Sequence, residues 1–87
     1  MKPLNYAILL YFTDVERACA DDVIAALQPT YGHFRALRKT AVTEALMTAE
    51  KNGLLEEAGY ELDDKDDLRV YYSANDASRA IIKKYIG

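Results

Sequence analysis

The sequence predicts one mainly α-helical domain with a small β-hairpin, an α+β fold that spans residues 1–87. Four segments, near 3–13, 21–28, 38–52 and 75–86, are rich in apolar residues and have the lengths and boundary residues of helices. Between the last two, a region near 54–73 alternates apolar and polar residues on either side of a polar loop, as a hairpin does. With 87 residues, of which 51% are hydrophobic, the chain can build one modest core.

The first segment is apolar on nearly every side between Leu4 and Thr13, and Pro3 suits the first turn of a helix. A helix at the surface of a domain normally shows a single apolar stripe. Two interpretations therefore stay open for this segment. It is either a central helix of the core, or a helix covered by its own domain on one side and by a second subunit on the other.

The second segment begins after the small residues Ala18–Ala20, which we interpret as a very short strand. Asp21 or Asp22 can then cap a helix, because a carboxylate accepts from the free backbone N–H groups of the first turn. Its buried side should hold Val23, Ile24, Ala26 and Leu27. Pro29 should end this helix, and a connection over 28–36 should follow.

The third segment has its small apolar stripe at helical spacing, in Val42, Ala45, Leu46 and Ala49. Gly53 should end this helix, because glycine readily adopts the left-handed conformation of a helix C-cap.

The hairpin should have one half-buried side, with a bulge at Gly59. The residues predicted on that side are Leu54, Ala58, Tyr60, Leu62, Leu68, Val70 and Tyr72. The loop between the strands, Asp63–Asp67, has four aspartates and one lysine, which leaves a net charge of −3 at the hairpin tip.

The final helix should be capped by Asn75 or Asp76 and should bury Ala77, Ala80, Ile81 and Tyr85. The predicted core consists of Ile8, Phe12, Ile24, Leu27, Val42, Leu46, Leu54, Val70, Tyr72 and Ile81. The first and last helices have more apolar residues than one small core can hold, so we expect a homodimer. The residues assigned to its interface are Leu4, Leu9, Tyr11, Ile82 and Ile86.

No pattern in the chain predicts an enzyme, a cofactor or a metal site. Cys19 and His33 are the single cysteine and histidine, and they do not form a zinc-binding spacing. The acidic loop lacks the glycine and the glutamate that a calcium loop needs. A lone cysteine fits a reducing compartment, so we expect a cytoplasmic protein, and no run reaches the roughly 20 apolar residues of a membrane span.

Two stretches resemble the winged helix-turn-helix regulators. LRKTAVTEALMTAEKNGLLEE is similar to their recognition helix and its exit, with Thr40, Val42, Thr43, Leu46 and Gly53 among the matching positions. LRVYYSANDASRAIIKKY resembles the second wing strand and the following helix of the PadR-like group. The resemblance implies a three-helix core, a two-stranded wing and a C-terminal helix. It departs from the family in a longer turn before the recognition helix and in an acidic wing tip.

Two functions follow as expectations. The first is a small transcriptional regulator that reads double-stranded DNA with helix 38–52. Phosphates would be held by Arg35, Arg38 and Lys39, and base edges would be contacted by Thr40, Thr43, Glu44 and Met47. The alternative is a winged-helix module that binds a protein partner and no DNA. The alternative is supported by the net charge of −3 and by the acidic wing, because nucleic-acid-binding domains usually show a basic face.

Overall fold

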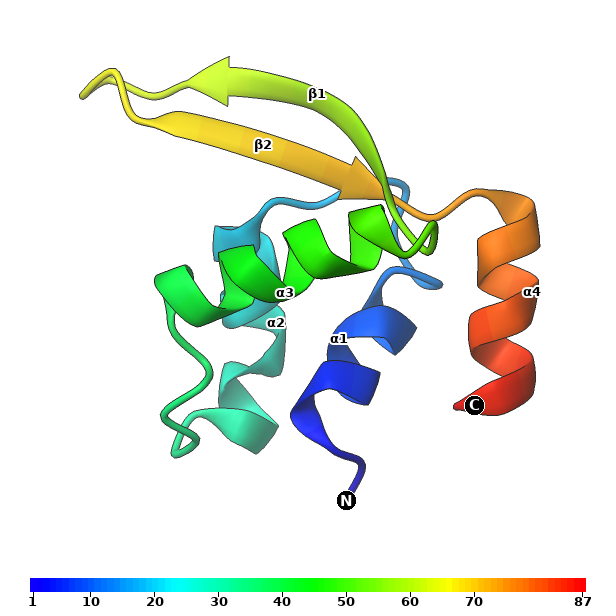
Figure 1. Ribbon diagram of the computed structural model, residues 1–87. Coiled ribbons are helices and arrows are strands. Elements are labelled where there is room, and N and C mark those ends of the chain that lie inside the picture. Colours follow the sequence, from blue (N-terminus) through cyan, green and yellow to red (C-terminus); the bar gives the residue numbers. More distant parts are fainter.

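The computed structural model describes residues 1–87 and has an α+β architecture of four helices and a two-stranded antiparallel sheet. The elements in chain order are α1 (Leu4–Tyr11), α2 (Ala20–Tyr31), α3 (Lys39–Lys51), β1 (Glu56–Leu62), β2 (Leu68–Ser73) and α4 (Asp76–Tyr85). Helix α2 packs against α1 and α3, and the hairpin runs alongside α3 as a long arm (Figure 1). Helix α4 lies at the opposite end from the hairpin tip, beside α1. None of the helices combines the length and the apolar character needed to span a lipid bilayer.

The core joins the three N-terminal helices to the base of the hairpin. Five residues predicted for the core are buried, namely Ile8, Phe12, Val42, Leu46 and Tyr72. Four others are half-buried against it, namely Ile24, Leu27, Leu54 and Val70. Leu55, which is only 2% exposed, enters the core in place of Leu54. The chain leaves α3 through Gly53 at φ +78°, which confirms the glycine C-cap.

The start of α2 differs from the prediction. The expected short strand is a single bridge between Ala18 and Tyr72, with backbone hydrogen bonds of 2.9 Å in both directions. Cys19 occupies the N-cap position. Asp22 acts from the third helical position, where its carboxylate accepts from the Cys19 N–H at 3.0 Å and from the Cys19 thiol at 3.3 Å. The prediction of an aspartate N-cap was therefore wrong, although Asp22 does satisfy a backbone donor at this helix end.

Helix α2 also continues through Pro29 to Tyr31, so the prediction that Pro29 ends it was wrong. The proline lies in the last turn, where its fixed φ is compatible with a helix and only one intrahelical hydrogen bond is lost. Tyr31 is buried, and its hydroxyl donates to the carbonyl of Lys2 at 2.6 Å. This tertiary contact holds the last turn in place. Of the side predicted to be buried, Ala26 is exposed.

Helix α4 is rotated relative to the prediction. Its buried residues are Ser78 and Ile82, whereas Ile81 is 48% exposed and Tyr85 is 74% exposed. The Ser78 hydroxyl donates to the carbonyl of Gly53 at 3.2 Å, and the Arg79 guanidinium donates to three backbone carbonyls. Polar groups thus lie on the inner side of α4, which hydrophobic periodicity alone does not reveal. The predicted burial of Ala77, Ala80, Ile81 and Tyr85 was wrong, because all four are exposed.

The hairpin contains the predicted bulge, because its register shifts between Glu57 and Tyr60 and Gly59 has φ +106°. Arg17 donates to the Ala58 carbonyl at 2.9 Å, with its guanidinium 4.3 Å from the centre of the Tyr71 ring.

The outer half of the hairpin extends past the helices (Figure 1). Its apolar residues are therefore largely exposed, at 71% for Tyr60, 62% for Leu62 and 56% for Leu68. The prediction of a half-buried side holds only for the inner half, around Val70 and Tyr72.

Candidate functional site

Helix α3 has one face in the core and one face open to solvent. Val42, Leu46 and Ala49 are buried, and their helical spacing leaves Thr40, Glu44 and Met47 exposed on the outside. Met47 is 46% exposed. Three of the four residues predicted to contact bases are therefore accessible from outside the fold.

The basic residues at the start of α3 do not form one free cluster. Arg35 and Arg38 are exposed and make no ion pair. Lys39 instead places its Nζ 3.6 Å from the Asp21 carboxylate, and Arg69 Nε lies 3.7 Å from the same carboxylate. All three side chains are partly exposed, so these ion pairs contribute little stability. Their main consequence is that Asp21 partly neutralises two of the cations beside α3.

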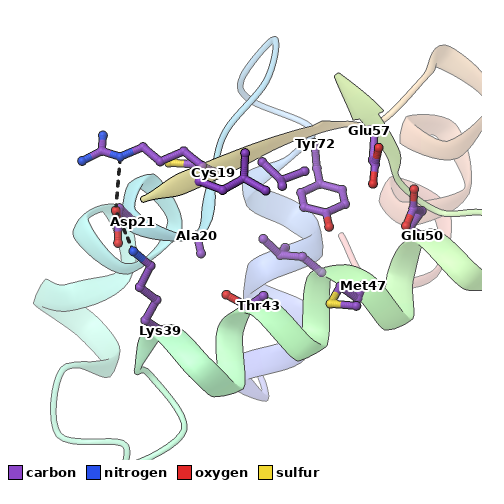
Figure 2. Close-up of a pocket in the computed structure, with 13 residues that line it drawn as sticks. Cys19, Ala20, Asp21, Lys39, Thr43, Met47, Glu50, Glu57 and Tyr72 are labelled. Atoms are coloured by element: carbon purple, nitrogen blue, oxygen red, sulfur yellow. Dashed lines mark ion pairs between the residues drawn. The ribbon is translucent and has the colours of Figure 1, made fainter. Parts of the chain in front are cut away.

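A cavity of about 230 Å³ lies between α3 and β2 (Figure 2). Thr43 and Met47 line it from the helix, and Val70 and Tyr72 line it from the strand. Thr43 is half-buried in this cavity, so it is less accessible than the other residues predicted to contact bases. The cavity was missed from the sequence. The alternation of β2 indicates that Leu68, Val70 and Tyr72 share a side, but it does not indicate which helix faces them.

Two carboxylates, those of Glu50 and Glu57, line one end of the cavity near Tyr72 (Figure 2). Burial raises the pKa of the Tyr72 phenol, and the negative charges of Glu50 and Glu57 raise it further. Burial likewise raises the pKa of the Cys19 thiol, which donates to Asp22. At neutral pH both groups are therefore protonated, and Cys19 lacks the thiolate character of a catalytic nucleophile.

These raised pKa values predict a loss of stability at alkaline pH. The pKa values of Cys19, Tyr11 and Tyr72 are all higher in the folded chain, mainly because of burial. The unfolded chain then releases its protons first, from about pH 8.5 to 10 upward, so the free energy of unfolding should fall as the pH rises through this range. Urea unfolding in the presence of a reductant, at pH 7, 9 and 10.5, measures this slope.

Tyr72→Phe should flatten the slope, and Tyr60→Phe, which changes an exposed phenol, should leave it unchanged. Equal slopes in wild type and in Tyr72→Phe would contradict a role for the buried phenol.

The acidic loop at the hairpin tip is organised by its own first residue. The Asp63 carboxylate accepts from the backbone N–H of Lys65 at 2.8 Å and from that of Asp67 at 2.9 Å. These two hydrogen bonds lower the pKa of Asp63. Asp66 adopts a left-handed conformation, with φ 62°. The loop is thus a defined turn, and the chain has no cluster of His, Cys, Asp or Glu side chains arranged to hold a metal ion.

The surface predicted for dimerisation is largely inside the fold. Leu4 and Ile82 are buried, because α1 and α4 pack together. The other three predicted residues are half-buried against the core, namely Leu9, Tyr11 and Ile86. The large apolar residues exposed on these two helices are instead Tyr6, Ile81 and Tyr85.

Comparisons with known proteins found no relative of this chain. The chain matches no protein-family model, no curated protein and no solved structure.

Proposed function

We propose that this chain is a winged helix-turn-helix regulator of the PadR-like type, which binds double-stranded DNA in the cytoplasm. In this proposal α3 is the recognition helix and the β1–β2 hairpin is the wing. One observation carries the proposal. Helix α3 presents an exposed face, with Thr40 and Glu44, next to an antiparallel hairpin, and the unpaired Arg35 and Arg38 precede that face.

The side chains divide into two roles. Arg35 and Arg38 would hold phosphates, which position a protein on the duplex without reading its sequence. Thr40, Glu44 and Met47 would enter the major groove, where a glutamate accepts from cytosine N4 and an apolar group contacts the thymine methyl. The hairpin tip, with its net charge of −3, would stay away from the phosphates because of electrostatic repulsion.

Replacing both free arginines, Arg35→Ala with Arg38→Ala, should weaken binding to every duplex sequence. If each arginine neutralises one phosphate, the slope of log K against log salt should become shallower by about 1.8. A fluorescence-anisotropy titration of a labelled duplex at several salt concentrations measures this slope. The matched control is Lys83→Ala with Lys84→Ala, which removes the same charge from exposed positions on α4.

Equal effects of the two double variants would show that only net charge matters, and would remove α3 from the interface. Light scattering on the same samples gives the mass of the species that binds. We expect a homodimer, since Tyr6, Ile81 and Tyr85 leave apolar area exposed on α1 and α4.

A protein-binding module is the second candidate, favoured by the exposed apolar side of the hairpin. Tyr60, Leu62 and Leu68 are each more than half exposed, and they lie next to the acidic tip. Such a surface suits a partner with apolar and basic side chains. If a sample of verified mass binds no duplex at low salt, this second function becomes the better account of the fold.

A further inference from the structure

The cavity between α3 and β2 contains a polar group that no protein group satisfies. The Tyr72 residue is 5% exposed, and its hydroxyl makes no hydrogen bond within the protein and keeps a small contact with solvent. The hydroxyl points into the cavity, on the side of Glu50 and Glu57 (Figure 2). A hydroxyl that faces a cavity and has no protein partner is free to donate to a ligand or to accept from one, so the cavity offers a site that a ligand can complete.

The walls of this cavity define the chemistry of a ligand. Leu46, Val70 and Met47 provide an apolar surface, and Cys19 and Ala20 line the wall formed by the start of α2. Its volume of about 230 Å³ is ample for a ring-sized group, because an apolar cavity of about 150 Å³ already binds benzene. One end therefore accepts an apolar body, and the other offers two carboxylates and a phenol.

We propose that this cavity binds a small primary amine with an apolar body, in its protonated form. The ammonium group would donate to the carboxylates of Glu50 and Glu57 and to the oxygen of Tyr72. An ammonium has three donors, which matches these three acceptors, and the phenol can accept while its own proton is donated to a carboxylate. The opposite end of the cavity disfavours a second cation, because Lys39 and Arg69 lie there with Asp21.

A bound amine would also affect the outer face of α3. Met47 lines the cavity and is one of the residues proposed to contact bases. Thr43 and Lys39, on the same helix, also line the cavity. The ligand should therefore lower the affinity for DNA, a consequence that rests on the proposed function. The binding of the amine itself does not depend on that function, because it can be measured on the protein without DNA.

Calorimetry with 2-phenylethylamine at pH 7, in the absence of DNA, tests the site. The neutral analogue 2-phenylethanol has the same ring and chain length, so it isolates the contribution of the ammonium group. We expect the amine to bind about tenfold more tightly than the alcohol, given the strength of hydrogen bonds to charged groups. This comparison uses the wild-type chain, so it does not depend on the folding of a variant. No measurable binding of the amine, or equal affinities for the two compounds, would overturn the proposal.

Variants then identify the residues responsible for the preference for the amine over the alcohol. Glu50→Gln with Glu57→Gln should abolish the tenfold preference for the amine, and Tyr72→Phe should weaken amine binding by about three- to tenfold. The matched control is Glu16→Gln with Glu61→Gln, which changes the same charge at exposed positions outside the cavity. Loss of the preference in the control pair as well would assign it to net charge and overturn the site. If the amine binds but the protein binds no DNA, the site stands and the DNA-binding proposal fails.

Discussion

Leu46→Ala is expected to lower the free energy of unfolding by about 2–5 kcal/mol. Leu46 is 1% exposed and belongs to the core cluster that joins α3 to the other helices and to the base of the hairpin. Removing three carbons there loses apolar burial and leaves a cavity that close-packed neighbours fill only in part. A domain of 87 residues has a small total stability, so this loss is a large share of it.

Urea unfolding followed by circular dichroism measures the effect of Leu46→Ala. Thr48→Ala is the control on the same helix, because Thr48 is exposed and its replacement should change stability by no more than about 0.5 kcal/mol. A loss of that small size for Leu46→Ala would mean that Leu46 lies at the surface in solution, and the orientation of α3 described here would be wrong.

Arg79→Met should also destabilise the fold strongly, by about 1.5–3 kcal/mol. The Arg79 guanidinium donates to the carbonyls of Ala74 at 2.7 Å, Thr13 at 3.3 Å and Val15 at 2.7 Å. These hydrogen bonds tie α4 to the connection between α1 and α2. Methionine keeps most of the aliphatic stem but leaves these part-buried carbonyls without their donors, which is the main cost.

The same urea experiment measures Arg79→Met, and hydrogen exchange of the α4 amides reports whether that helix loosens. Lys83→Met is the matched control, because it replaces an exposed cation on the same helix by the same residue. If the two variants lose equal stability, the hydrogen bonds of Arg79 contribute nothing beyond its charge.

The sequence by itself determined the order and type of the secondary-structure elements. Local signals suffice for this, because a helix and a strand bury residues at different spacings and because glycine accepts a positive φ. The stripe through Val42 and Leu46 predicted α3, and Gly53 marked its end. The alternation around Val70 and Tyr72 predicted β2, and Gly59 marked the bulge.

Only the tertiary structure decided which side of α4 faces the core and what surrounds the outer face of α3. Arg79 reaches carbonyls 64 and 66 residues away, so the rotation of α4 depends on contacts that no local pattern contains. Asp21 pairs with Lys39 and with Arg69 in the same way, across three elements. The cavity beside Tyr72 exists because α3 and β2 are placed at a particular separation. Periodicity determines which residues share a face, whereas long-range packing determines what that face meets.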